Sequence, residues 1–225
     1  MGVASNAVLT NGRVVVRIVA KSLSVLAVVC AVACQSPVVS SDGPSEAERR
    51  SQVKETSQKA ESDPDPRIVA TAGWTTRQLE RGIARVSPDN DYDLVLLLIG
   101  ANNAFGGESA ESFRPDFVGL LERAVQFAGG AAQRVVVMTL PDHSVTPAGR
   151  RHGAERAHRR VTAYNRVIRQ ETEAAGARLV DLAPVSRRAE ERPELVADDG
   201  LHPAAKMHAL WTDELTPVVL EALGR

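Results

Sequence analysis

The chain has 225 residues, room for one ordinary α/β domain with an N-terminal extension, and its 44% of hydrophobic residues excludes wholesale disorder. A formal net charge of −1 gives no electrostatic reason to expect nucleic acid or an acidic surface as partner. The two cysteines, Cys30 and Cys34, are too few for a disulfide framework and form no pattern typical of a metal site, so we expect neither a metal nor a cofactor.

The first predicted element is an export signal over residues 1–33. Three basic residues precede an apolar run from 22 to 33, which at about twelve residues is too short to span a bilayer as a helix. The basic residues are Arg13, Arg17 and Lys21. The apolar run ends in Ala31-Val32-Ala33-Cys34, which resembles a bacterial lipobox. This resemblance implies that Cys34 is lipidated and that the protein reaches the membrane only through a lipid anchor.

Two alternatives to a lipidated leader stay open. Simple secretion into the periplasm or the medium needs only the basic and apolar regions. The stretch from Val25 to Cys34 also has the composition of a buried parallel β-strand, because a short Val-rich run is typical of both structures. A leader that is removed and a strand that is retained exclude each other in one mature protein.

Residues 34–66 are polar and rich in Ser, Asp, Glu and Pro, which predicts a linker. The part from Ser45 to Ala60 has helical propensity, but only three of its residues are apolar. Such a helix would have little face to bury against a core. We therefore expect a polar linker or a degenerate first helix ahead of the folded domain at residues 67–225.

Strands and helices alternate four times from residue 67 onward. We expect strands at 68–70, 93–99, 134–140 and 177–182, and helices at 75–86, 111–128, 155–175 and 206–223. The predicted strands are apolar throughout and do not alternate between apolar and polar residues. This pattern favours an α/β fold in which helices cover both faces of a parallel sheet.

Three segments with unusual residues fall at the ends of predicted strands or in the last loop. They contain Gly73, the sequence Gly100-Ala101-Asn102-Asn103, and the sequence Asp199-Gly200-Leu201-His202. In open α/β sheets reactive groups gather on loops at the carboxyl ends of the strands. Each segment alone also suits an ordinary turn or surface loop, but together they indicate one site. Leu140 to His143, which follows another strand, can line its pocket.

The residue types in these segments suit acyl transfer. The Gly73 backbone N–H and the Asn102 amide can donate hydrogen bonds to the oxyanion of a tetrahedral intermediate. His202 can accept the proton of a hydroxyl nucleophile, and Asp199 can fix the tautomer of the imidazole ring. We therefore predict His202 and Asp199 as catalytic residues, with Gly73 and Asn102 in an oxyanion hole and no metal.

In this order the segments resemble SGNH hydrolases, the GDSL-type esterases and lipases, over about residues 67–225. The family's lone Gly matches Gly73, its Gly-x-Asn-Asp matches Gly100 and Asn102, and its Asp-x-x-His matches Asp199 and His202. The resemblance implies a three-layer flavodoxin-like fold and hydrolysis of carboxylic esters, with small-molecule, lipid or carbohydrate esters as substrates. Asn103 stands where the family usually has Asp.

The family's first block, Gly-Asp-Ser, is absent from this chain. The family places this nucleophile block some 30–40 residues before Gly73, where the chain has Cys34-Gln35-Ser36. Ser36 is the tentative nucleophile. The sequence thus predicts an exported ester hydrolase. An alternative is a catalytically impaired lipoprotein of the same fold that acts as a binding module, and a third hypothesis is an unrelated flavodoxin-type binding protein.

Overall fold

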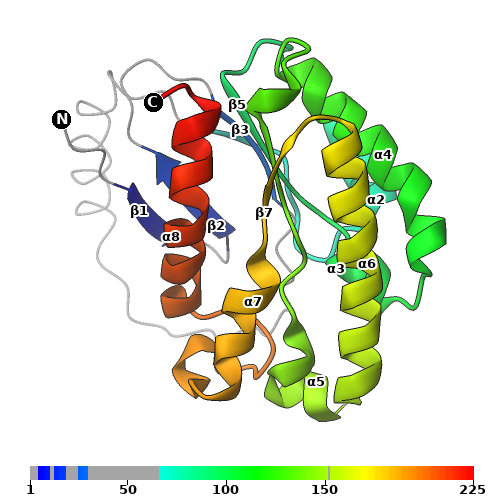
Figure 1. Ribbon diagram of the computed structural model, residues 1–225, viewed down its shortest axis with the longest axis vertical. Coiled ribbons are helices and arrows are strands. Elements are labelled where there is room, and N and C mark those ends of the chain that lie inside the picture. Colours follow the sequence, from blue (N-terminus) through cyan, green and yellow to red (C-terminus); the bar gives the residue numbers. More distant parts are fainter. Residues whose placement is uncertain (1–4, 11–12, 19–24, 30–65, 152) are drawn as a thin grey trace, which may run out of the picture.

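A parallel β-sheet lies at the centre of the molecule (Figure 1). The computed structural model describes residues 5–10, 13–18, 25–29, 66–151 and 153–225. The five strands of this sheet stand in the order β4-β3-β5-β6-β7. They are β3 (Val25–Val29), β4 (Arg67–Ile68), β5 (Leu94–Leu98), β6 (Val135–Met138) and β7 (Arg178–Val180). Every residue of β5 and β6 is buried, which is why these strands are apolar throughout.

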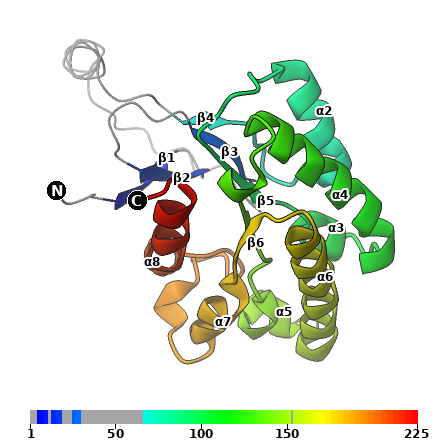
Figure 2. The ribbon, with the colours of Figure 1, turned by 45° about the horizontal axis from the view of Figure 1, so that its top comes forward.

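Helices cover both faces of the sheet. They are α2 (Thr76–Val86), α3 (Ala101–Phe105), α4 (Ala110–Phe127), α5 (Pro147–Arg151), α6 (Ala154–Ala174), α7 (Leu182–Ser186) and α8 (Ala205–Ala222). Figure 2 shows α2, α4 and α6 on one side of the strands and α8 on the other. The predicted α/β fold with three layers and a parallel sheet is confirmed.

The two longest helices on one face show why the sequence forms them. In α4 the buried residues recur every three or four positions, so one face of the helix packs on the core. These residues include Phe113, Phe117, Leu120, Leu121 and Ala124. The helix ends where Gly129 and Gly130 take positive φ angles of 64° and 85°. The α6 helix buries Val161, Tyr164, Val167 and Ile168 in the same way.

The N-terminal residues form three strands. Strands β1 (Ser5–Thr10) and β2 (Arg13–Ile18) pair antiparallel, and β1 lies against α8 (Figure 1). Strand β3 pairs in parallel with β4 on one side and β5 on the other. This is the arrangement that a retained Val-rich strand would adopt. The lipidation candidate Cys34 and the linker at 34–65 lie outside the described residues. Among the described helices, none has the length and apolar character needed to cross a membrane.

Helix α8 carries a buried histidine beside a tryptophan ring. His208 is buried, and its ring meets the Trp211 ring edge-on with centroids 5.1 Å apart. Within the described part of the chain His208 Nδ1 has no hydrogen-bond partner. Burial disfavours the charged imidazolium and lowers the pKa of His208 from 6.5 to about 4. The ring is therefore neutral at pH 7.

We expect the buried His208 to make the free energy of unfolding depend on pH between about 6.5 and 4. In this range the unfolded chain binds the proton and the folded chain does not, so stability present above pH 6.5 is lost as the pH falls. The loss should approach about 3 kcal/mol at the acid end. Urea denaturation of wild type and His208→Phe at pH 7 and pH 4.5 measures it. An equally steep loss in the variant would contradict the assignment to His208.

Candidate active site

Asp199 and His202 form a hydrogen-bonded pair within one turn before α8. One carboxylate oxygen, Oδ1, accepts the backbone N–H groups of Leu201 at 2.8 Å and His202 at 2.9 Å. The other, Oδ2, contacts His202 Nδ1. The turn is closed by the His202 carbonyl, which accepts the Ala197 N–H at 2.8 Å. The predicted pairing of Asp199 with His202 is thus present, and the same carboxylate orders both the backbone and the ring.

The electrostatics of this pair suit a general base. Burial tends to raise the pKa of Asp199, but the hydrogen bonds from His202 and Leu201 outweigh it and hold the pKa below its ordinary value of 3.8. Asp199 is therefore ionised at neutral pH and keeps the ring proton on Nδ1. His202 Nε2, the nitrogen left with the lone pair, is buried and has no hydrogen-bond partner among the described residues. It is the nitrogen on which a hydroxyl proton can be received.

The segments with Gly73 and Asn102 lie side by side at the carboxyl end of the sheet. The Asn102 side-chain amide donates to the Trp74 carbonyl at 2.9 Å, which fixes the plane of the amide next to Gly73. Gly73 has a φ of +85°, and a Cβ placed there would meet no atom of the described residues within 4 Å. The backbone of Gly73 therefore has an open face beside the Asn102 amide. The structure brings together the two predicted oxyanion-hole donors.

The position of Gly100 requires a glycine because of its backbone conformation and its close packing. Its φ of +117° lies in a region that side chains rarely adopt. A Cβ at this position would also stand 2.9 Å from Cε2 of the buried Phe113 ring. Glycine therefore lets β5 turn directly into α3, and this turn places Asn102 in the first turn of the helix.

The buried side chain of Asn103 connects three segments of the chain through hydrogen bonds. Its Oδ1 accepts the Thr76 backbone N–H at 3.1 Å at the start of α2. Its Nδ2 donates to Thr76 Oγ1 at 2.9 Å and to Glu108 Oε2 at 2.7 Å. The sequence alone marks Asn103 only as a departure from the family's Asp. The structure gives the physical reason for an amide here, because the bond to the Glu108 carboxylate needs a donor.

We expect Asn103→Asp to destabilise the protein by about 2 kcal/mol, because a second carboxylate would face Glu108 and a donated hydrogen bond would be lost. Urea denaturation at pH 7 measures the change. Adding Glu108→Gln to the same chain should restore most of the loss, since the glutamine amide can donate to the new carboxylate. Additive effects of the two substitutions would show that the pair is not coupled.

The segment that follows β6 connects the two halves of the candidate site. The His143 ring stacks on Phe105, at the end of α3, with centroids 4.3 Å apart. Five residues further on, the Ala148 N–H donates to the Gly200 carbonyl at 2.9 Å, in the turn that holds His202. The helix carrying Asn102 and the turn carrying His202 are therefore both attached to residues 143–148. Burial is the main factor that lowers the pKa of His143, so its ring is neutral at pH 7.

The tentative nucleophile Ser36 lies outside the described residues. Within the described part of the chain, no group of three or more His, Cys, Asp or Glu side chains could hold a metal ion. The candidate site thus combines the Asp199–His202 pair before α8 with two predicted donors, Gly73 and Asn102, that lie next to each other on loops after β4 and β5. These are the parts that an acyl-transfer site requires besides its nucleophile.

A model of the GDSL-like lipase/acylhydrolase family matches residues 32–210. The chain belongs to this family. The matched range includes Ser36, Gly73, Asn102, Asp199 and His202. The predicted family is confirmed, and at the level of the family the protein is a serine ester hydrolase. No curated protein matches the chain in sequence.

Several solved structures share this fold. A GDSL-like lipase from Parabacteroides merdae has 16% identity and a TM-score of 0.57, with 91% of this chain and 96% of that chain covered. An acetyl xylan esterase from Geobacillus stearothermophilus has 16% identity and a TM-score of 0.55, with 88% and 95% covered. The structure of TesA has 14% identity and a TM-score of 0.55, with 89% and 99% covered. At such identities the likeness concerns the fold.

Proposed function

We propose that this GDSL-family protein hydrolyses acyl or acetyl esters by a Ser-His-Asp mechanism, with Gly73 and Asn102 as the oxyanion hole. The observation that carries the proposal is the state of His202. Asp199 occupies its Nδ1, and its Nε2 is buried without a hydrogen-bond partner among the described residues. An imidazole held in this way is ready to accept a proton from a hydroxyl group.

In the proposed mechanism the serine oxygen attacks the ester carbonyl carbon while His202 Nε2 takes the hydroxyl proton. The charge that develops on the carbonyl oxygen is stabilised by the Gly73 N–H and the Asn102 amide. The carboxylate of Asp199 stabilises the imidazolium. His202 then returns the proton to the leaving alcohol, which departs from the acyl-enzyme. A water molecule, deprotonated by the same nitrogen, releases the acid and regenerates the serine.

Ser36 is the proposed nucleophile. Strand β3 ends at Val29, at the same edge of the sheet where β5 leads into Asn102, and Ser36 follows seven residues later. Reactive groups of open α/β sheets gather at this edge. The family match also begins before Ser36, at residue 32. The short distance from the end of β3 supports Ser36 over serines further along the chain.

The test combines turnover with active-site labelling of the full chain. The protein should hydrolyse 4-nitrophenyl acetate, and a fluorophosphonate probe should label one serine that peptide mapping identifies as Ser36. Ser36→Ala should abolish both signals, whereas the matched control Ser41→Ala should retain them. A label on a different serine would overturn the assignment of Ser36. The absence of both turnover and label would overturn the serine mechanism.

A binding module without turnover is the second candidate function, and the absent Gly-Asp-Ser block favours it. The chain would then retain the esterase fold and bind the ester without cleaving it. Two of the similar solved structures are named acetyl xylan esterases, so acetylated xylo-oligosaccharide is the ligand we would use to separate the candidates. Release of acetate supports the hydrolase. Binding without acetate release supports the module.

Export is a further part of the proposal, and it rests on the basic and apolar segments that end at Cys34. The same apolar residues supply β3, so cleavage before Cys34 would remove the strand between β4 and β5. Mass spectrometry of the protein isolated from a bacterial host distinguishes cleavage before Cys34 from retention of β3. A lipidated N-terminal Cys34 supports an anchored lipoprotein. A chain that keeps residues 25–29 and stays inside the cell overturns export.

A further inference from the structure

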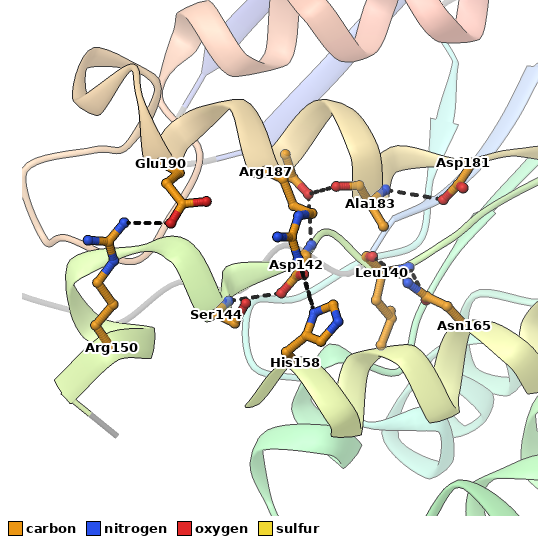
Figure 3. A network of polar contacts seen from close by, with 11 residues as sticks. Leu140, Asp142, Ser144, Arg150, His158, Asn165, Asp181, Ala183, Arg187 and Glu190 are labelled. Carbon is orange, nitrogen blue, oxygen red and sulfur yellow. Dashed lines mark hydrogen bonds and ion pairs between the residues drawn. The ribbon is translucent and has the colours of Figure 1, made fainter. Parts of the chain in front are cut away.

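A cavity lies between α6 and α7, and none of the predicted catalytic or oxyanion residues lines it. Its volume is about 540 Å³, within the range of small-molecule sites. One wall is a continuous face of α6 that runs from His158 to Glu173. The opposite wall is formed by Asp181, the first residues of α7, and Arg187 (Figure 3). We call this cavity the α6–α7 groove.

The charged side chains of the α6–α7 groove are arranged by depth. The carboxylate of Asp142 lies at the bottom, with only 2% of its side chain exposed. The side chains of His158, Arg169 and Arg187 lie above it and are 48%, 42% and 45% exposed. Arg166 is exposed on the same face of α6. A ligand entering the groove therefore meets guanidinium groups before it meets Asp142.

Two of these guanidinium groups are already held in position by carboxylates. Arg187 Nη1 donates to Asp142 Oδ2 at 3.1 Å, and His158 Nδ1 contacts the same oxygen at 2.7 Å. Arg169 Nη2 lies 2.9 Å from Asp181 Oδ2. A guanidinium has five N–H donors, so one bond to a carboxylate leaves others for a ligand. Because these side chains have already lost rotamer freedom, binding a ligand on them costs less entropy.

Arg166 differs from the other two arginines of the groove in its pairing, although Asp142, Asp181 and Glu173 match the three arginines of the lining in number. Among the described residues it has no carboxylate partner, in contrast to Arg169 and Arg187. Glu173, at the far end of the same helix face, is the one exposed carboxylate of the lining. Arg166 and Arg169 are three residues apart, so both project from neighbouring positions on α6 toward the groove. Guanidinium groups in such a cluster match the geometry of carboxylate and phosphate oxygens.

We propose that the α6–α7 groove is a binding site for a small molecule that carries an oxyanion, either a carboxylate or a phosphate. Arg166, Arg169 and Arg187 bind the anion, and Val161, Ala183 and Pro184 provide apolar contact for the rest of the molecule. The site is separate from ester cleavage and does not depend on the proposed catalytic mechanism.

Isothermal titration of the full chain at constant ionic strength tests this site. The probes are inorganic phosphate, glucuronate, and glucose as a neutral sugar of the same ring. We expect at least one anion to bind and glucose not to bind. Binding of glucuronate alone identifies a carboxylate ligand, binding of phosphate alone identifies a phosphate ligand, and binding of both identifies a general oxyanion site.

Arg166→Gln should weaken anion binding about tenfold, because it removes a charged donor and breaks no ion pair among the described residues. The matched control is Arg159→Gln, on the same helix but paired to the exposed Glu155 outside the groove, and it should bind as the wild type does. His202→Ala should also bind as the wild type does, which separates this site from the catalytic one. Equal weakening by Arg166→Gln and Arg159→Gln, or no binding of either anion, would overturn the proposal.

Discussion

His202→Ala is expected to lower kcat/KM for 4-nitrophenyl acetate by about a thousandfold, with little change in the free energy of unfolding. A general base contributes roughly 10²–10⁴-fold to the rate, and in a serine hydrolase the same group also protonates the leaving alcohol. The effect should appear in kcat, because the imidazole acts on the reacting atoms and not on the remote parts of the ester. Steady-state kinetics at pH 7 measures it, and urea denaturation verifies that the variant is folded.

Asp199→Asn provides the companion measurement. The asparagine keeps an oxygen for the backbone N–H groups of Leu201 and His202 but cannot stabilise an imidazolium. We expect a loss in kcat that is smaller than that of His202→Ala. In the double variant Asp199→Asn/His202→Ala the two losses should not add, because the two residues act as one unit. Turnover by His202→Ala at the wild-type rate would contradict the assigned role of this histidine.

The elements of the sheet could be predicted because their sequence signals are local. The predicted strand at 93–99 is β5 (Leu94–Leu98), and the predicted helix at 111–128 is α4 (Ala110–Phe127). Buried strands are apolar along their whole length, and a helix on a sheet repeats its apolar residues every three or four positions. The end of α4 could be located in the same way, from the pair Gly129-Gly130.

The N-terminal strands could not be predicted uniquely from the sequence. The composition of Val25–Val29 suits an export signal as well as a strand, and its pairing with β4 and β5 has no signal in the local sequence. The short helices α3, α5 and α7 have too few residues to show a periodic pattern. The contact that Pro203 makes just before the last helix also has no local sequence signal. Pro203 pairs with Val196 in an isolated bridge, and α8 begins at Ala205.

The candidate site, like the fold, has contacts that the sequence predicts and contacts that it does not. Asp199 and His202 are three residues apart, so a turn alone can bring them together, and the sequence predicted the pair. The contact of Asn102 with the Trp74 carbonyl joins residues 28 positions apart, and the bond from Thr76 to Asn103 joins residues 27 apart. Contacts of this kind depend on how β4 and β5 are placed in the sheet, and no local sequence pattern predicts them.

A comparison of two Asp–His pairs shows how geometry separates the proposed catalytic pair from a structural one. Asp142 contacts His158 Nδ1 as Asp199 contacts His202 Nδ1. Arg187 Nη1 also lies 3.2 Å from His158 Nδ1 and shares the Asp142 oxygen, so this pair belongs to a structural network. His202 has Asp199 as its partner on Nδ1 and a buried Nε2. Only the second arrangement is suited to moving a proton to and from a substrate.

Asp142→Ala is expected to reduce the free energy of unfolding by about 4 kcal/mol, more than any other substitution considered for stability. The carboxylate, in the loop after β6, accepts from Ser144 in the same loop, from His158 on α6 and from Arg187 after α7 (Figure 3). Its removal leaves the buried Ser144 N–H without its acceptor, which costs about 1–3 kcal/mol. It also breaks a buried ion pair, and losing one partner of such a pair costs roughly 3–5 kcal/mol when the other stays buried.

The half-exposed Arg187 and His158 can recover part of that cost by turning toward water, which is why we expect less than the sum of the two effects. Glu155→Ala is the matched control, since it removes a carboxylate paired to Arg159 at the exposed surface, and such pairs contribute about 0.5 kcal/mol or less.

The effect of Asp142→Ala should also depend on pH. Burial opposes ionisation of Asp142, but hydrogen bonds from Ser144 and His158 outweigh it and lower the pKa from 3.8. The stability contributed by the carboxylate is therefore present above about pH 3.8 and lost as the pH falls below it. Urea denaturation of wild type, Asp142→Ala and Glu155→Ala at pH 7 and pH 3 measures both effects. If Asp142→Ala is no less stable than Glu155→Ala at pH 7, the network does not join α6 to α7 in the way its contacts indicate.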